Sequence, residues 1–143
     1  MLKQVLFAIS FFLAALFLTA QTPCENGFAG IYPCSGYDLC SYTSLEDLGG
    51  RVKGNDCWGW VDEVSGREFV IYGRTGGTSF VEITDPYSPV YLAELPPPIA
   101  PSIWRDMKVI ENYVYIVTES GGGIQIVELT QLCLLYTSPS PRD

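Results

Sequence analysis

The feature that most constrains this chain is a stretch that returns at a fixed offset. Val81-Glu82-Ile83-Thr84 recurs as Val127-Glu128-Leu129-Thr130, an offset of 46 residues (127 − 81). At the same offset, and without any gap, Gly76-Gly77 recurs as Gly122-Gly123 and Trp58 as Trp104. A period of about 40–50 residues made of strand patterns indicates radial repetition, most often a β-propeller. We therefore expect an all-β fold with about two propeller blades in this sequence.

Strand patterns and turn residues divide the repeated part into two blades. β-Branched and aromatic runs separated by Gly, Pro, Asn and Asp are typical of short antiparallel strands. The first blade is expected at 56–95, a stiff Pro-rich connector at 96–101, and an incomplete second blade at 102–132. The predicted strands are 57–61, 68–73, 78–83 and 90–95 in the first blade, and 102–110, 113–118 and 124–129 in the second. Two blades cannot close a ring, so we expect exposed sheet faces and self-association.

The first twenty residues have the pattern of a secretory signal peptide. Lys3 supplies a positive charge, residues 5–18 are almost wholly apolar, and Leu18-Thr19-Ala20 offers a cleavage site made of small residues. The apolar run is shorter than the roughly 20 residues that a membrane span needs. We therefore expect removal of residues 1–20 and an exported mature protein without a transmembrane helix.

The last eleven residues interrupt the repeat where another strand is expected. The string from Cys133 to Asp143 matches the conceptual translation of a transposase-type sequencing adapter. The alternative is a natural tail rich in Ser and Pro. We expect residues 133–143 to be non-native, and the native chain to continue past Leu132 with further blades.

The segment 21–55 carries most of the cysteines. Cys24, Cys34, Cys40 and Cys57 lie close together in sequence, and an even number in an exported protein predicts two disulfides of undetermined connectivity. A zinc site is the alternative, but the spacings contain no Cys-x-x-Cys pair. A short helical turn is expected at 45–48, with Ser44 as its N-cap and Gly49-Gly50 as its end.

Several chemistries are disfavoured by what the sequence lacks. The chain contains no histidine, which excludes His-based triads and His-ligated zinc from this sequence. Its net charge of −8 and its lack of a basic patch argue against nucleic acid as a partner. The glycine-rich loops open no helix, and Asp56, Asp62 and Asp85 do not form a calcium loop. We expect no cofactor, no metal site and no catalytic residues.

Trp104-Arg105-Asp106 is the most promising group of site residues. Arg105 or Asp106 could face a ligand, or one of them could tie neighbouring blades through hydrogen bonds, which is the interpretation we favour. Trp58, Trp60 and Trp104 could form an aromatic platform for sugars, although burial between the sheets is expected for such large side chains.

A family resemblance rests on these same residues. The segment 80–92, Phe-Val-Glu-Ile-Thr-Asp-Pro-Tyr-Ser-Pro-Val-Tyr-Leu, resembles the LVIVD repeat. With Tyr32-Pro33-Cys34, Asp38-Leu39, the segments 55–60 and 77–81, and Trp104-Arg105-Asp106-Met107-Lys108-Val109, the chain resembles the choice-of-anchor B family. That resemblance implies an exported bacterial propeller with a C-terminal sorting or anchoring signal, held at the cell surface or released, and without an established catalytic activity.

We therefore expect a secreted or cell-surface module that binds an extracellular protein or glycan. The alternative is an extracellular propeller hydrolase or lyase whose catalytic residues lie in further blades, since paired carboxylates can cleave glycosides. A third possibility is a structural spacer in an envelope assembly.

Overall fold

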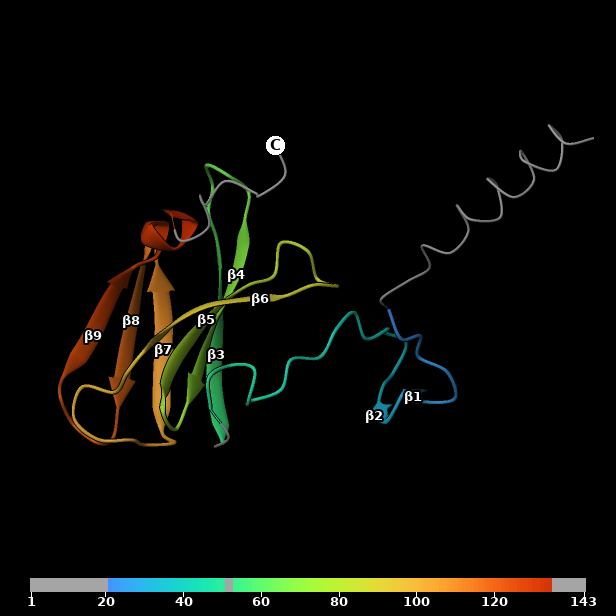
Figure 1. The fold of residues 1–143 in the computed structure, drawn as a ribbon, viewed down its shortest axis with the longest axis horizontal. Coiled ribbons are helices and arrows are strands. Elements are labelled where there is room, and N and C mark those ends of the chain that lie inside the picture. The colour runs from blue at the N-terminus through green and yellow to red at the C-terminus, as the bar shows by residue number, and fades with distance from the viewer. Residues whose placement is uncertain (1–20, 51–52, 135–143) are drawn as a thin grey trace, which may run out of the picture. The chain divides into compact units, whose positions relative to one another are not determined.

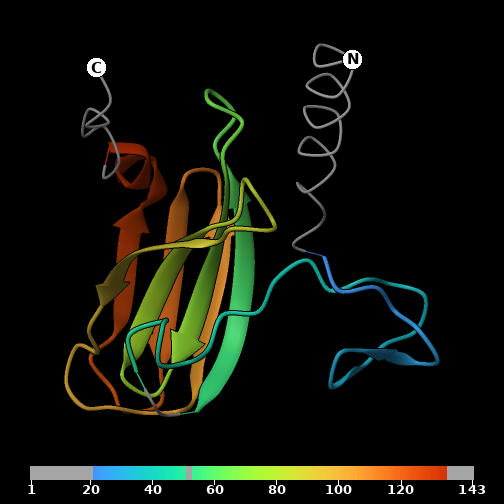
Figure 2. The ribbon, with the colours of Figure 1, turned by 45° about the vertical axis from the view of Figure 1, so that its right-hand side comes forward.

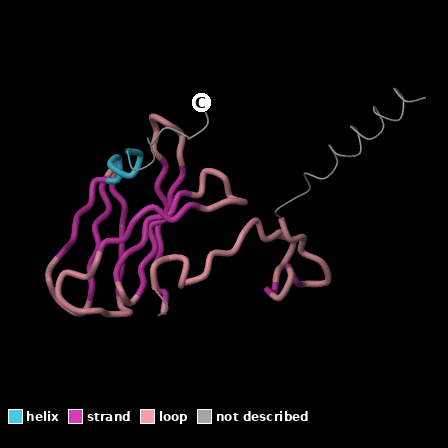
Figure 3. The backbone as a smooth tube through the Cα atoms, in the orientation of Figure 1, coloured by secondary structure: helices cyan, strands magenta, loops and turns pink. Residues whose placement is uncertain are grey.

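The computed structural model describes residues 21–50 and 53–134. Contacts divide the chain between Ser41 and Tyr42 into two units, which are described separately. The predicted signal peptide and residues 135–143 of the predicted non-native tail lie outside the described residues. Within the described part, strands dominate and one short 3₁₀ helix follows the last of them, so the predicted all-β class is confirmed (Figure 3).

The first unit is a small disulfide-bonded loop. Strands β1 (Phe28–Ala29) and β2 (Tyr32–Pro33) pair as a short antiparallel hairpin. The Cys24–Cys34 disulfide closes the chain around them. The backbone N–H of Cys24 also donates to the Asp38 carboxylate at 2.8 Å. These cross-links hold together a segment that has little apolar core of its own.

The second unit contains two antiparallel sheets whose strands follow one another in chain order (Figure 1). The first sheet consists of β3 (Gly54–Val61), β4 (Glu68–Arg74), β5 (Gly77–Glu82) and β6 (Val90–Leu95). The second consists of β7 (Arg105–Ile110), β8 (Tyr113–Thr118) and β9 (Ile124–Glu128), followed by the 3₁₀ helix η2 (Leu129–Leu134). All seven predicted strands are present, although β7 begins three residues later than predicted. Both sheets are open.

The two sheets form layers around one hydrophobic core (Figures 1 and 2). The core side chains alternate along their strands with residues on the opposite face, which is the period of two that strands impose. The first sheet contributes Trp60, Phe69, Ile71 and Phe80, and the second contributes Met107, Val114 and Ile116, with Leu129 and Leu132 from η2.

The segment before β3 covers the other face of the first sheet. The Ser44 hydroxyl accepts the Asp47 N–H at 3.2 Å, as the predicted cap requires, and Gly49 ends the turn with a φ of +92°. The segment is a hydrogen-bonded turn rather than a helix. The Leu48 carbonyl then accepts the Ser79 hydroxyl of β5 at 2.7 Å. Residues 44–49 therefore belong with the sheets, and not with the cysteine-bearing loop.

The strand register corrects the gap-free repeat. Val81 and Val127 are equivalent at the offset of 46, and their partners Val70 and Val114 differ by 44. Val70 pairs in turn with Gly59 of β3, and Val114 pairs with Val109 of β7, so Gly59 and Val109 are equivalent at an offset of 50. Trp58 is therefore equivalent to Lys108, and Trp104 lies just before β7. The first hairpin of the second sheet is shorter and its second hairpin longer, which is why a single offset does not hold.

Candidate functional site

A cavity of about 360 Å³ lies where β7 begins and β8 ends. The antiparallel register pairs Arg105 with Thr118 and Asp106 with Val117, which brings the predicted site residues beside the end of β8. The Glu119 N–H donates to the Trp104 carbonyl at 3.3 Å and extends this pairing. The residues around the cavity are Asn55, Trp104, Arg105, Asp106, Val117, Thr118 and Glu119.

The structure separates the three tryptophans. Trp60 is buried against Phe69, with ring centroids 5.2 Å apart. Trp58 is partly buried against the core, and the Lys108 Nζ lies 3.8 Å from the centroid of its ring. Trp104 is 59% exposed, so the expectation of burial is wrong for this residue. The reason is its position before β7, outside the alternation that turns Trp58 and Trp60 toward the second sheet.

The Arg105 side chain points into the molecule rather than into solvent. Only 2% of the residue is exposed, and its Cδ lies 3.5 Å from the position a Cβ would take on Gly73 of β4. Among the described residues, Nε and both Nη atoms are buried and have no hydrogen-bond partner. Burial, and then the charge of Arg74, lower the pKa of Arg105 from its ordinary value. The aliphatic part of the Arg105 side chain therefore packs over Gly73, and its guanidinium is buried.

Two carboxylates meet at one backbone amide between the sheets. The Met107 N–H lies 3.0 Å from Asp56 Oδ2 and 2.9 Å from Asp106 Oδ1. Beside them, Asn55 Nδ2 donates to the Arg105 carbonyl at 2.9 Å. Partial burial alone would raise the pKa of Asp56, but hydrogen bonds from the Met107 backbone and with the Asp106 carboxyl group outweigh it and lower that pKa. Asn55 and Asp56 thus attach β3 to β7.

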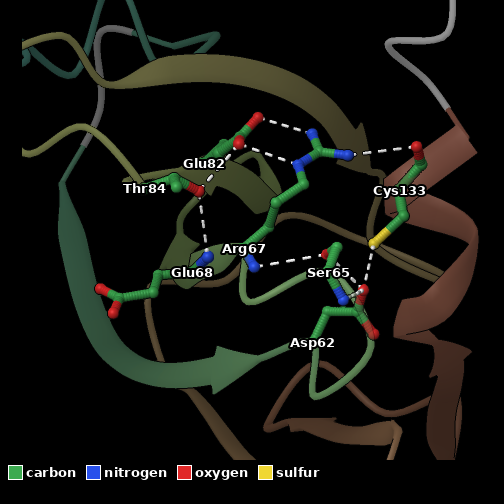
Figure 4. Close-up of polar contacts among 7 residues, drawn as sticks. All are labelled: Asp62, Ser65, Arg67, Glu68, Glu82, Thr84 and Cys133. Carbon is green, nitrogen blue, oxygen red and sulfur yellow. Dashed lines mark hydrogen bonds and ion pairs between the residues drawn. The ribbon is translucent and has the colours of Figure 1, made fainter.

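A second polar cluster lies at the turn between β3 and β4 (Figure 4). Arg67 forms a two-pronged ion pair with Glu82, at 2.8 and 2.6 Å, and lowers the pKa of that carboxyl group. The Arg67 Nη1 also donates to the Cys133 carbonyl at 3.1 Å, and the Cys133 thiol donates to Asp62 at 3.4 Å. The cluster thus links the turn between β3 and β4 to β5 and to η2.

The cysteines give one disulfide, between Cys24 and Cys34. Cys40 and Cys57 are free thiols and belong to different units, so a second disulfide stays a prediction. Within residues 21–50 and 53–134, no group of three or more His, Cys, Asp or Glu side chains is placed to hold a metal ion. The same residues include no helix long and apolar enough to cross a membrane.

The sequence analysis did not identify the bond from Met107 to Asp56, nor four of the residues around the cavity, Asn55, Val117, Thr118 and Glu119. The two-residue turn at Glu111-Asn112 carried part of the signal, because it sets a register that pairs Arg105 with Thr118. The contact from β3 to β7 joins residues 51 positions apart (107 − 56) and has no local signature.

No protein-family model, curated protein or solved structure matches this chain.

Proposed function

We propose that this protein is an exported or cell-surface β-propeller of LVIVD-type repeats that binds an extracellular protein or glycan and has no catalytic activity. One observation carries the proposal: two sheets that repeat in sequence also repeat in topology and stack face to face through neighbouring strands β3 and β7. Stacked antiparallel sheets of this kind are the building units of propellers. The Cys24–Cys34 disulfide fits an oxidising, extracellular compartment.

The carboxylate geometry favours binding over glycoside cleavage. A glycosidase needs one carboxylic acid with a raised pKa to protonate the leaving group. Asp56 and Asp106 instead accept the same amide hydrogen, and the lowered pKa of Asp56 means that Asp56 is not such an acid. The alternative is an extracellular hydrolase or lyase whose catalytic residues lie in further blades, and it stays open for the complete protein.

Trp104 is the side chain we assign to ligand contact. It is a large aromatic group exposed at the cavity, and tryptophan is enriched among residues that dominate binding energy. Its backbone is fixed on both sides, because its N–H donates to the Ser102 hydroxyl at 3.2 Å and its carbonyl accepts from Glu119. A C-terminal domain is the part we expect to hold the protein at the surface.

The test is a binding screen of the full chain against immobilised extracellular proteins and neutral and acidic glycans, with product release followed in the same wells. We expect saturable binding without turnover, and at least tenfold weaker binding for Trp104→Ala. Tyr37→Ala is the control, because Tyr37 is an aromatic side chain that is 82% exposed and does not line the cavity. Turnover of a glycan would establish the enzyme alternative, and the absence of any binding would refute the proposal.

A further inference from the structure

We propose that the uncovered face of β7–β9 is the docking surface for a further unit of the same repeat, and that Asp106 forms the hydrogen bond that attaches it. This inference rests on the proposed repeat architecture and names the partner of a particular surface. The opposite, apolar face of β7–β9 covers the first sheet and consists of Met107, Val109, Val114, Ile116 and Val127. The partner is a further sheet that presents a face of the same kind.

The sequence repeat maps the buried face of the first sheet onto the exposed face of the second. Phe80, 3% exposed, corresponds to Ile126, 58% exposed, and Thr78, fully buried, corresponds to Ile124, 59% exposed. The same register matches Phe69 with Tyr113 and Trp60 with Ile110, and both partners in the second sheet are exposed. The face that is packed in the first sheet is therefore apolar but uncovered in the second sheet.

The polar attachment repeats together with the apolar face. Cys57 and Met107 are equivalent in register, because they pair with Tyr72 and Ile116. The aspartates that directly precede them, Asp56 and Asp106, are therefore equivalent as well. Asp56 accepts the Met107 N–H of the following sheet. Asp106 is exposed on the uncovered face, where the same reach would meet the corresponding N–H of another unit.

The side of the cavity lined by Val117 and Asp106 is the space that such a unit would fill. In the first sheet, Arg105 and Met107 pack over Gly73, with the Met107 Cε 2.8 Å and the Arg105 Cδ 3.5 Å from the position of an added Cβ. The register places Val117 of β8 where Gly73 lies in β4. Val117 and Asp106 both line the cavity. This side of the cavity thus corresponds to the space over Gly73 that Arg105 and Met107 occupy on the first sheet.

A second copy of this chain does not offer the required face. The face of the first sheet equivalent to the apolar face of β7–β9 that contains Met107 and Val127 includes Ser79, which is fully buried under the turn at residues 44–49. Arg74 lies on that same face, 2% exposed, bonded to Ser79 and paired with Glu94. The first sheet is capped on this face, whereas the second sheet is uncovered, so the repeat is extended from β7–β9.

The experiment adds one period to the full chain by repeating residues 87–132 directly after Leu132. This restores the spacing of 46 residues. It supplies a second strand like β6 and a second copy of β7–β9, whose apolar face with Met107, Val109, Val114, Ile116 and Val127 is the one expected to cover the uncovered face. We expect binding of the dye 8-anilinonaphthalene-1-sulfonate to fall and the Tm to rise relative to the original chain.

The substitution Asp106→Ala then distinguishes docking of the added sheet through this hydrogen bond from a non-specific collapse of the extended chain. In the extended chain, we expect this substitution at the first copy of Asp106 to lower the Tm by about 4–8 °C, as the loss of a hydrogen bond to a charged group does. In the original chain it should shift the Tm by less than half as much, whereas Asp56→Ala should lower the Tm of both chains.

The outcomes distinguish this inference from the proposed function. Unchanged dye binding in the extended chain, or an equal effect of Asp106→Ala in both chains, would overturn the docking proposal and leave the binding screen unaffected. A docked third unit without binding of any protein or glycan would support this inference and refute the proposed function.

Discussion

Two glycines at the same place in the repeat are expected to differ sharply when each is replaced by alanine. Gly77 begins β5 with a φ of +150°, and an added Cβ would lie 2.4 Å from the Leu95 carbonyl oxygen of β6. Gly123, 46 residues later, has a φ of +75°, and no atom lies within 4 Å of its added Cβ. Both changes strain the backbone, but only Gly77→Ala also collides with a neighbouring strand.

The expected magnitudes follow from these two contributions. An L-residue at positive φ costs about 1–2 kcal/mol, which is the whole effect expected for Gly123→Ala. At Gly77, relieving a contact of 2.4 Å requires β6 to move at the Thr78–Leu95 pair, and overpacking of this kind adds about 1–3 kcal/mol. We therefore expect Gly77→Ala to lower the free energy of unfolding by about 2–5 kcal/mol.

Urea unfolding of both variants, followed by circular dichroism and tryptophan fluorescence, measures the difference. All three tryptophans lie in the unit that contains both glycines. Equal losses of stability in the two variants would show that the approach of β6 to Gly77 contributes nothing. A neutral Gly77→Ala would refute the β5–β6 geometry itself.

Three further changes test other parts of the structure. Arg105→Met should raise the free energy of unfolding by about 1–4 kcal/mol in the same urea assay, because it removes a buried charge that has no partner among the described residues; a loss of stability would reveal a partner. The bond to Arg67 lowers the pKa of Glu82 in the folded state, so the charged carboxylate stabilises the fold at any pH above its ordinary pKa of 4.5. This contribution is lost as the pH falls below 4.5 and through the lower pKa of the folded state. In thermal melts from pH 6 to pH 3, the Glu82→Gln variant should therefore lose less Tm than the original chain. Ile126→Lys on the uncovered face should reduce binding of 8-anilinonaphthalene-1-sulfonate without lowering the Tm, whereas Ile116→Lys, which places a charge in the core, should unfold the two sheets.

The strands could be predicted because their signals are local. Alternating β-branched and aromatic residues, Gly-rich loops and the Asp85-Pro86 turn each act within a few positions, and the strands form where these patterns predict. Strand alternation also places Arg105 and Asp106 on opposite faces of β7, although it does not indicate which of the two faces is buried. The sequence pointed to Trp104, Arg105 and Asp106 together, but the structure gives them three different environments.

The remaining features depend on contacts between distant strands. Trp104 is exposed because β7 is offset from β3 by 50 residues rather than by the 46 of the sequence repeat. Only the pairing of β7 with β8 determines this offset. The bond from Met107 to Asp56 joins two sheets, and neither strand alone indicates it. A fixed offset in sequence is therefore a good guide to which strands repeat, and a poor guide to which side chains are equivalent.

The offsets between equivalent strands explain how the repeat tolerates hairpins of different length. The offsets between equivalent strands are 50 for β3 and β7, 44 for β4 and β8, and 46 for β5 and β9. All three are even numbers. Because side chains alternate with a period of two, an even change keeps every apolar residue on its face, whereas an odd change would turn the whole set outward. Insertions of two residues are thus compatible with stacking of the sheets. The same alternation places Met107 on the face of β7 that meets the first sheet and Asp106 on the uncovered face of β7–β9.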